Sequence, residues 1–267
     1  MNSRMFEAAS ALKARMRARE PVIGTWITLG HPGIAEICAD AGFDWLVIDM
    51  EHSAIGIDTA ADLIRTISLS GGVPLVRMPD HSPTLIKRVM DAGAAGVIVP
   101  TVNTAEQAAA VVSAVKYPAM GTRGVGLARA QEYGLGFETY KAWQEAGSIV
   151  LVQIEHIDGV ANIDAICATP GLDGVFVGPY DLSGSMGMPG ALSDPRVEAS
   201  VARVAEAAIA AGISAGYHVV PRIPEQVAER IAQGFNFVAY TLDSIVLAET
   251  YRDHLALIGG LLGGDAS

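Results

Sequence analysis

Eight short apolar runs alternate with helix-like segments along almost the whole of this chain. The runs, which we expect to be strands, lie at 22–29, 45–50, 74–78, 96–101, 149–155, 174–178, 215–220 and 237–241. Several of them, such as Trp45-Leu-Val-Ile and Gly96-Val-Ile-Val, are apolar at consecutive positions. That pattern is typical of parallel strands that are covered on both faces. The alternation therefore restricts the chain to an α/β fold with a parallel sheet.

The segments between the runs predict helices that close the sheet into a barrel. Apolar residues recur three and four positions apart at 32–41, 59–70, 83–92 and 225–233. A glycine follows many of the helical segments, where it can adopt the left-handed conformation that ends a helix; these are Gly42, Gly93, Gly171, Gly212 and Gly234. Eight such units with right-handed crossovers form a (β/α)8 TIM barrel. A doubly wound open sheet is the alternative, but no Gly-x-Gly-x-x-Gly turn follows the first run.

The length of 267 residues suits one barrel domain, although two small domains would also fit. Apolar residues in the first twenty positions recur at helical spacing, namely Met5, Phe6, Ala9, Leu12 and Met16. We therefore expect residues 1–20 to form an amphipathic helix packed on the barrel, and residues 21–267 to form a single barrel domain. The basic residues of this segment faintly resemble a transit peptide, but the apolar core of a secretory signal is missing. The expected location is the cytoplasm.

The net charge and the apolar runs of the sequence disfavour two classes of partner. The formal net charge of −11 disfavours nucleic acid and anionic membrane surfaces. No apolar run approaches the roughly 20 residues that a membrane-spanning helix needs. The two cysteines, Cys38 and Cys167, lie in helix-like segments and are expected to be buried thiols in a reducing compartment. Small molecules are the expected partners.

Two of the expected strands are followed by a carboxylate where the strand should stop. Glu155 ends the run 149–155, and Asp181 follows the run 174–178. If these strands are parallel neighbours, both side chains lie at one end of the sheet. Two ionised carboxylates about 4 Å apart repel by roughly 4 kcal/mol at an effective dielectric constant near 20. A divalent cation removes that repulsion, and oxygen ligands suit Mg2+ or Mn2+. Two solvated acids at the starts of loops are the alternative.

Barrel enzymes place their sites at the carboxyl ends of the strands. The polar residues expected there are Asp49, Glu51, His52, Arg77, Gln153, Glu155, Asp181, His218 and Asp243. The four lysines of the chain all fall in predicted helices or loops, so none is placed for a Schiff base. A carbonyl substrate would have to be polarised by a metal ion instead. A long connection at 117–136 interrupts the alternation and could cap the site or reach a neighbouring subunit.

The motifs at these positions resemble the HpcH/HpaI aldolases, which are metal-dependent class II pyruvate aldolases such as 4-hydroxy-2-oxoheptanedioate aldolase and 2-keto-3-deoxy-sugar-acid aldolases. The resemblance runs from about residue 22 to residue 247 and is specific as an ordered set. Its motifs are Gly24-Thr-Trp, Ala41-Gly-Phe-Asp-Trp45, Ile48-Asp-Met-Glu-His52, Val76-Arg-Met-Pro79, Tyr117-Pro-Ala-Met-Gly-Thr-Arg-Gly124, Gln153-Ile-Glu155 and Val177-Gly-Pro-Tyr-Asp-Leu-Ser183. It implies a barrel of the phosphoenolpyruvate/pyruvate-domain type.

The resemblance also implies roles for single residues. Glu155 and Asp181 match the metal-binding carboxylates of the family. Arg77 and Gln153 match residues that hold the keto acid, and Arg77 also lies near its ketone oxygen. Neutralising the neighbouring acids is the alternative role for Arg77.

Proton transfer is implied for two further residues. His52 matches the acid/base histidine, and Asp91 matches the acid that pairs with it. Histidine suits proton removal from a 4-hydroxyl because its ordinary pKa is near neutrality. An ordinary exposed histidine is the alternative for His52.

The remaining site residues surround the second carboxylate and the seventh strand. The backbone at Gly178, Pro179, Tyr180 and Asp181 matches the amides that bind the pyruvate carboxylate. Tyr180 stands where a small residue is expected, and its ring could narrow the pocket or point outward. His218 stands where an aliphatic residue is expected. It could favour a hydroxylated or an acidic substrate, or make only a local hydrogen bond.

The expected reaction is the reversible cleavage of 4-hydroxy-2-oxo acids to pyruvate, or a close analogue such as hydroxypyruvate, and an aldehyde. It would run through an enolate stabilised by Mg2+, Mn2+ or Co2+. An oxaloacetate decarboxylase or related lyase that uses the same metal enolate is the alternative among enzymes, and a non-catalytic metabolite-binding barrel is the alternative outside them. The resemblance further implies a homohexamer, a trimer of dimers, with the last helix exchanged between barrels.

Overall fold

The computed structural model describes residues 3–262, which form a closed barrel of eight parallel strands. The strands are β1 (Val22–Ile27), β2 (Trp45–Asp49), β3 (Pro74–Arg77), β4 (Gly96–Val99), β5 (Ile149–Ile154), β6 (Gly174–Val177), β7 (Ser214–Val219) and β8 (Phe237–Leu242). Each strand pairs with the next in sequence, and β8 pairs with β1. The predicted (β/α)8 barrel is therefore confirmed, and each predicted strand agrees with the observed one within two residues at either end.

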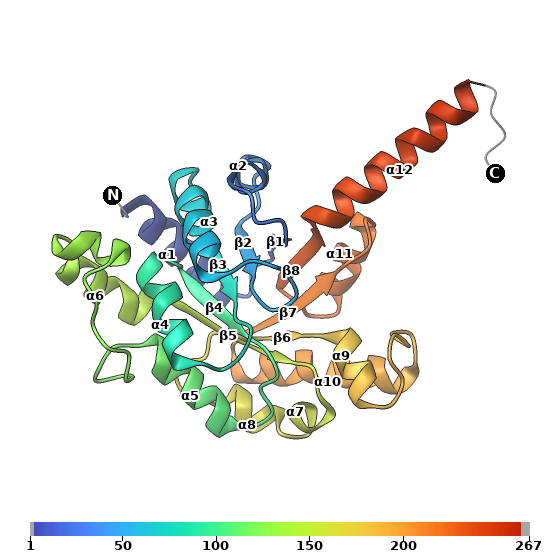
Figure 1. Cartoon of the computed structure of the whole chain (residues 1–267). Coiled ribbons are helices and arrows are strands. Elements are labelled where there is room, and N and C mark those ends of the chain that lie inside the picture. The colour runs from blue at the N-terminus through green and yellow to red at the C-terminus, as the bar shows by residue number, and fades with distance from the viewer. Residues whose placement is uncertain (1–2, 263–267) are drawn as a thin grey trace.

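Helices surround the strands in the expected order (Figure 1). They are α1 (Ser3–Arg17), α2 (Pro32–Asp40), α3 (Ile57–Leu69), α4 (Pro83–Ala92), α5 (Ala105–Val115), α6 (Phe137–Gly147), α7 (Ile157–Ala161), α8 (Ile163–Cys167), α9 (Pro179–Ser185), α10 (Pro195–Ala211), α11 (Pro224–Ala232) and α12 (Asp243–Leu261), with a 3-10 helix η1 (Arg129–Gly134) before α6. Local chemistry sets their ends. The Ser82 hydroxyl accepts the amide of Leu85 at the start of α4, and Gly93, with φ of 105°, ends it.

Aromatic rings from four of the strands pack inside the barrel. Trp45 of β2 stacks on Phe237 of β8 at 4.0 Å, and Phe176 of β6 makes an edge contact with Trp26 of β1 at 5.8 Å. Glycine makes room for these rings: a Cβ on Gly24 would lie 2.1 Å from the Trp45 ring. The aromatic layer supports the residues at the carboxyl ends of the strands and closes the barrel beneath them.

Helix α1 packs at the other end of the barrel, beside the starts of the strands. Its buried apolar residues include those whose spacing predicted the helix, and the ring of Phe6 stacks on Trp143 of α6 at 4.5 Å. Lys13 reaches inward to Asp173 at 2.9 Å and donates to the carbonyl of Ser148. The amino ends of the strands are therefore covered, and access to the barrel is from the carboxyl ends.

The long connection 117–136 also lies toward the amino ends of the strands. Gln131 donates to the hydroxyl of Tyr117 and to the carboxylate of Asp91 at the end of α4, and Arg129 donates to the carbonyl of Ala92. The connection follows α5, which runs back from the carboxyl-end rim after β4, and it leads through α6 into the start of β5. It therefore does not cap the site of its own barrel, which was one of the two alternatives considered for it.

Helix α12 extends away from the barrel (Figure 1). Asp243 is its only buried residue, and the Asp243 carboxylate accepts the amides of Thr28 and Leu29. Beyond that anchor the helix carries many exposed apolar side chains: Val246, Leu247, Tyr251, Leu255, Leu257, Ile258 and Leu261. Within residues 3–262, no helix is both long enough and apolar enough to span a membrane.

The tight contact at Gly24 gives a test of the barrel interior. Gly24→Ala should lower the free energy of unfolding by about 3 kcal/mol, because the added methyl overlaps the buried Trp45 ring. Gly124→Ala is the control, since Gly124 is exposed and its added Cβ would meet nothing within 4 Å. Urea unfolding of both variants measures the difference. Equal stability of the two would contradict the packing described here.

Candidate active site at the carboxyl ends of the strands

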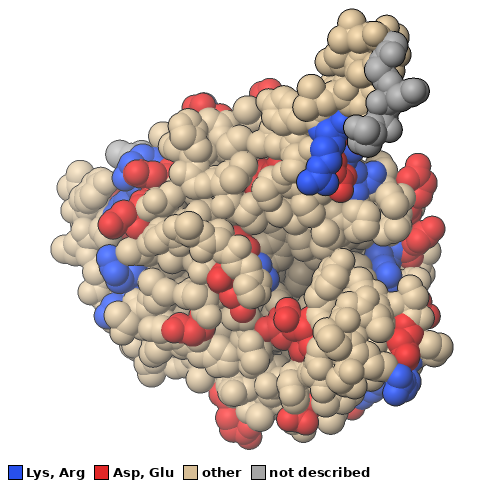
Figure 2. Space-filling view, turned by 45° about the vertical axis from the view of Figure 1, so that its right-hand side comes forward, with Lys and Arg blue, Asp and Glu red and all other residues tan. Residues whose placement is uncertain are grey.

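Two adjoining cavities open at the carboxyl ends of the strands. The smaller has a volume of about 280 Å³ and the larger about 600 Å³, and His52, Tyr180 and Asp181 line both. Figure 2 shows a hollow near the middle of this face, with acidic side chains at its margin. The cavities lie where the strands place their last side chains. The site residues predicted at the strand ends are therefore brought together, as a (β/α)8 barrel requires, except Asp243, whose carboxylate binds the amides of Thr28 and Leu29.

Glu155 follows β5 and is held in the larger cavity by neighbouring donors. Its side chain is buried, and Oε1 accepts the amide of Thr101 at 2.7 Å and the Thr101 hydroxyl at 2.9 Å. Oε2 accepts a hydrogen bond from the side-chain amide of Gln153. Gly178 must be glycine at this point, since a Cβ there would lie 2.7 Å from Oε2. The carboxylate of Glu155 is thus fixed in one orientation.

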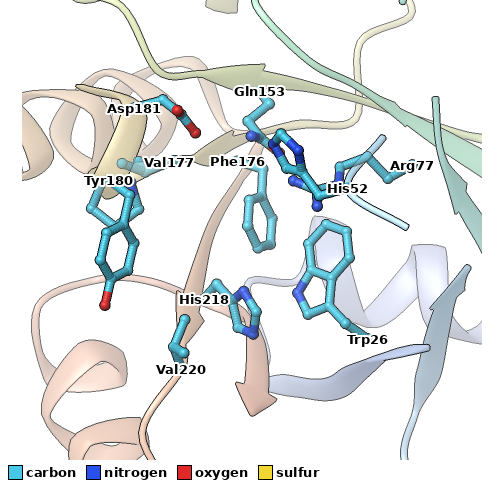
Figure 3. A pocket seen from close by; sticks show the side chains of 12 residues that line it. Trp26, His52, Arg77, Gln153, Phe176, Val177, Tyr180, Asp181, His218 and Val220 are labelled. Atoms are coloured by element: carbon cyan, nitrogen blue, oxygen red, sulfur yellow. The ribbon is translucent and has the colours of Figure 1, made fainter. Parts of the chain in front are cut away.

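Asp181 stands in the first turn of α9, which begins at Pro179 directly after β6. Its side chain is exposed and lines both cavities, and Figure 3 shows its carboxylate turned toward Gln153. Because β5 pairs in parallel with β6, the ends of these two strands lie side by side. Glu155 and Asp181 therefore line one cavity, as the sequence predicted. Glu155 is held rigidly, whereas Asp181 accepts no hydrogen bond from the described residues.

Arg77, at the end of β3, is the cation of this site. Its Nε and Nη2 donate to the two oxygens of Asp49 at 2.9 and 2.7 Å, and its Nη1 lies 3.1 Å from Glu51 Oε2. The guanidinium also lies over the ring of Trp26, 4.3 Å from its centroid. Arg77 therefore neutralises rim acids, the alternative role considered for it, and at the same time lines the smaller cavity.

Asp49 and Glu51 respond to this environment in opposite ways. Burial disfavours the Asp49 carboxylate, but the hydrogen bonds and charge of Arg77 and two backbone amides outweigh it, so the Asp49 pKa is lowered. Burial raises the pKa of Glu51 to about 7, and the charge of Glu155 adds to the rise while Arg77 opposes it. Glu51 Oε2 is buried and accepts no hydrogen bond from the described residues. The negative charge of the carboxylates in the site thus exceeds the positive charge of the Arg77 guanidinium.

His52 is exposed at the mouth of both cavities, with Nε2 3.9 Å from Glu51 Oε2. The predicted partner of His52 lies elsewhere. Asp91 ends α4, which runs from the carboxyl-end rim back toward the start of β4, and its carboxylate accepts a hydrogen bond from Gln131. Burial raises the pKa of Asp91. Within this chain Asp91 therefore does not pair with His52, and that prediction is corrected.

The opposite wall of the smaller cavity holds Tyr180 and His218. The Tyr180 side chain is 51% exposed, and Figure 3 shows its ring turned away from Gln153 and Arg77. Tyr180 therefore points outward, one of the two orientations considered for it. His218 lines the cavity from β7, and its Nε2 lies 3.0 Å from the carbonyl of Thr241.

The donor set fits a hard divalent cation. Within residues 3–262 no group of three or more His, Cys, Asp or Glu side chains could hold a metal ion by itself. Mg2+ is commonly held by only one or two carboxylates together with water and substrate oxygens. Glu155 and Asp181 supply two such carboxylates. Gln153 donates to Glu155, and its Oε1 is buried with no hydrogen-bond partner among the described residues. An oxygen-lined cavity with surplus negative charge suits that kind of ion.

A Schiff-base site is not formed at this end of the barrel. The lysine with the most altered basicity is Lys116, whose pKa burial lowers to about 7. Its ammonium group donates to the carbonyls of Gln144 and Glu145 and to the hydroxyl of Ser148. These partners lie at the end of α6 and the start of β5, away from the cavities. The expectation that no lysine serves the site agrees with this placement.

Sequence reasoning missed three contributors to the site. Trp26 and Phe176 form the inner wall of the smaller cavity, and Thr101 holds Glu155. The motif Gly24-Thr-Trp contained Trp26 but gave no reason to point its ring into the site. Thr101, with φ of 54°, turns its amide toward Glu155, a conformation that no local pattern signals.

Known proteins resemble this chain closely. A family model described as HpcH/HpaI aldolase/citrate lyase matches residues 22–250. The chain is 38% identical over 255 residues to a 2-keto-3-deoxy-L-rhamnonate aldolase of Salmonella typhi, a match that covers 93% of each protein. It is also 38% identical to a hydroxypyruvate/pyruvate aldolase of Pseudomonas aeruginosa, covering 94% of this chain and 92% of that protein. The crystal structure of an HpcH/HpaI aldolase/citrate lyase family protein from Burkholderia cenocepacia J2315 superposes with a TM-score of 0.89, at 35% identity, covering 93% of this chain and 99% of that one.

The raised pKa of Glu51 predicts a pH-dependent stability. Between the ordinary value of 4.5 and about 7 the folded protein binds a proton that the unfolded chain has released, so stability falls as pH rises through this window. In chelator-treated protein, Glu51→Gln should match wild type at pH 4 and be more stable by up to about 3 kcal/mol at pH 8. Urea unfolding at both pH values measures this. A Glu51→Gln variant that is less stable than wild type at pH 8 would contradict the pKa assignment.

Proposed function

Since this chain belongs to the HpcH/HpaI aldolase/citrate lyase family and is a carbon–carbon lyase of the class II pyruvate aldolase type, we propose that the cavities at the carboxyl ends of its strands are the reaction centre. We propose further that the substrates are 4-hydroxy-2-oxo acids, cleaved reversibly to pyruvate, or hydroxypyruvate, and an aldehyde. The observation that carries this proposal is the meeting of Glu155 and Asp181 in one cavity beside Arg77 and Gln153.

In this proposal Glu155 and Asp181 bind a divalent cation, which is Mg2+, Mn2+ or Co2+. When bound, the cation supplies Lewis-acid polarisation of the 2-oxo group. Glu155 is the fixed ligand because Thr101 and Gln153 hold both of its oxygens. Asp181 is the adaptable ligand because it is exposed and has no protein donor among the described residues.

Groups on both sides of Glu155 and Asp181 orient the substrate. Arg77 is anchored by Asp49, so its charge stays at the smaller cavity, where it can stabilise negative charge that develops on the ketone oxygen. The side-chain amide of Gln153 lines the same wall. The backbone amides of Tyr180 and Asp181 lie in the first turn of α9, where helix amides have no partner within the helix, and we assign them to the substrate carboxylate.

His52 is assigned the proton transfer. Cleavage requires that the 4-hydroxyl lose its proton as the C3–C4 bond breaks, with the electron pair of that bond passing to C3 and the ketone oxygen. The imidazole of His52 is open to both cavities and can accept that proton. C3 of the enolate then takes up a proton from solvent to complete pyruvate. Among the described residues, Glu51 is the acid within 4 Å of the His52 ring, with Oε2 3.9 Å from Nε2.

Small molecules are thus the proposed partners of this site.

We also propose that the enzyme is located in the cytoplasm. Two free thiols support that location. Cys38 is partly buried and Cys167 is buried, and burial raises their pKa values to about 11 and about 12. Thiols of this kind are unreactive and suit a reducing compartment.

The proposed assembly is a hexamer, a trimer of dimers, in which α12 is exchanged between barrels. The support is the length of α12 that carries exposed apolar side chains beyond its anchor at Asp243. Contiguous apolar surface of this kind is rarely left in water. The occupant that we propose is a second copy of this chain, which is what the resemblance to the family implies.

Metal removal tests the proposed ligands. Dialysis against a chelator should lower the rate of aldol cleavage by at least about 100-fold, and added Mn2+ should restore it. Glu155→Gln and Asp181→Asn should remain inactive at all Mn2+ concentrations that saturate wild type, whereas the exposed control Glu138→Gln should behave as wild type. Full activity of chelated wild type would contradict the metal assignment.

The base assigned to His52 is tested by comparing two reactions. Decarboxylation of oxaloacetate forms the same enolate but removes no hydroxyl proton. His52→Ala should therefore lower aldol cleavage by about 100-fold or more and leave decarboxylation within a few-fold of wild type. His156→Ala is the matched control, since His156 lines the larger cavity but its Nδ1 is occupied in capping α7. Equal losses in both reactions would remove His52 from the role of base.

Light scattering tests the assembly. Wild type should have the mass of a hexamer, and Leu255→Glu, which places a charge on the exposed apolar surface of α12, should shift it to smaller species without unfolding the barrel. Thr139→Glu on α6 is the control and should leave the mass unchanged. A monomeric wild-type protein would remove the assembly from the proposal.

A further inference from the structure

Two polar groups that face each other in the smaller cavity lack hydrogen-bond partners among residues 3–262. The Nε1–H of Trp26 is buried without an acceptor. His218 uses Nε2 for the Thr241 carbonyl, while its Nδ1 has no partner in the described structure. Figure 3 shows the indole nitrogen of Trp26 on the side of its ring that faces His218, and one imidazole nitrogen of His218 turned toward that side. The two ring centroids are 5.3 Å apart.

The contact to Thr241 determines which nitrogen of His218 carries the proton. A carbonyl oxygen can only accept, so Nε2 donates the hydrogen and Nδ1 presents a lone pair. Burial lowers the pKa of His218 to about 4, and the nearby charge of Arg77 adds to the effect, so the ring is neutral near pH 7. Nδ1 is therefore a hydrogen-bond acceptor that faces the cavity.

Both rings are held in place by their surroundings. Thr241 has a left-handed backbone, with φ of 49°, where the pairing of β1 with β8 shifts register between Gly24 and Trp26. Its carbonyl also accepts the Thr25 hydroxyl at 3.3 Å, which fixes the oxygen that orients His218. Trp26 is held by the edge contact with Phe176 and by Arg77 over its face. Neither ring can turn to satisfy its free nitrogen without giving up these contacts.

We infer that Trp26 and His218 form a subsite for a hydroxyl group of the substrate, which accepts a hydrogen bond from Trp26 Nε1–H and donates one to His218 Nδ1. A hydroxyl is the simplest group that can do both. A carboxylate cannot donate, and its charge would meet the lone pair of Nδ1. A methyl group can do neither. Of the two preferences considered for His218, the hydroxylated substrate is therefore selected over the acidic one.

This inference rests on the proposed aldolase function and narrows its substrate class. The hydroxyl can belong to the 2-oxo acid, as in hydroxypyruvate, or to the aldehyde, as in a 2-hydroxyaldehyde. Both place the same chemistry in the cavity that Arg77 and Gln153 share with Trp26 and His218. The free-energy cost of desolvating a substrate hydroxyl in this site is offset only if Trp26 Nε1 and His218 Nδ1 both form hydrogen bonds with it. The Trp26–His218 pair therefore discriminates against substrates that lack the hydroxyl.

The test measures kcat/KM for carbon–carbon bond formation with four substrate pairs. Pyruvate and hydroxypyruvate are each combined with propanal and with lactaldehyde, which differ by one hydroxyl. Two ratios of kcat/KM are formed, hydroxypyruvate over pyruvate and lactaldehyde over propanal. In wild type one of these two ratios should exceed ten, and that comparison, or arm, identifies which molecule carries the hydroxyl. Purified metal-loaded enzyme is used throughout, and melting temperatures establish that each variant is folded.

Three variants then separate the subsite from general damage. His218→Leu removes the acceptor and Trp26→Phe removes the donor while keeping the ring, so each should reduce the discriminating ratio by about tenfold, the loss of one ordinary hydrogen bond. His218→Asn restores an acceptor near the position of Nδ1 and should recover most of the ratio. If His218→Leu does not fold, Trp26→Phe carries the same test. A wild-type ratio near one in both arms, or a ratio unchanged in folded Trp26→Phe, overturns the inference.

Failure of the subsite and failure of the proposed function give different results. Exchange of the pyruvate methyl protons with D2O, followed by NMR, reports enolate formation without any aldehyde. If wild type shows no exchange and no bond formation with any pair, the proposed function fails and the inference fails with it. If exchange proceeds while the hydroxyl ratio is near one, only the Trp26–His218 subsite is wrong.

Discussion

The charge balance around Arg77 controls the chemistry at the carboxyl ends of the strands. Asp49 takes up two of the guanidinium donors, so that ion pair is nearly neutral as a unit. The remaining acids, Glu51, Glu155 and Asp181, share the same cavities without an equal number of cations. Burial makes this surplus costly, as the raised pKa of Glu51 shows. A divalent cation bound in the cavities would neutralise this surplus of negative charge. It would lie where a 2-oxo acid can bind to it.

The barrel supplies the rigidity that this arrangement needs. Parallel pairing of β5 with β6 sets Glu155 beside the start of α9, and hydrogen bonds from Thr101 and Gln153 hold its carboxylate. Beneath the cavities, the stacked and edge-on aromatic rings pack against one another. A preorganised set of charges of this kind needs little rearrangement when charge develops in the reaction. The substrate-facing hydroxyl subsite is built from the same aromatic layer.

Periodicity predicted the strands because a strand covered on both faces must be apolar at consecutive positions, as at Trp45-Leu-Val-Ile. The meeting of Glu155 and Asp181 followed from the order of the strands alone. The positions of side chains that depend on the three-dimensional course of the backbone could not be predicted from the sequence. Asp91 was assigned by motif, but α4 carries it to the other end of the barrel. The orientation of His218 depends on the left-handed Thr241, which no residue pattern in β8 announces.

The most direct test of this account is a crystal soaked with Mn2+ and pyruvate and measured for anomalous scattering. The account predicts one strong anomalous peak within bonding distance of a Glu155 oxygen and an Asp181 oxygen, with the ketone and one carboxylate oxygen of pyruvate completing the coordination. Well-ordered pyruvate near Arg77 with no anomalous peak between the two acids, or with Asp181 turned away from Glu155, would contradict it.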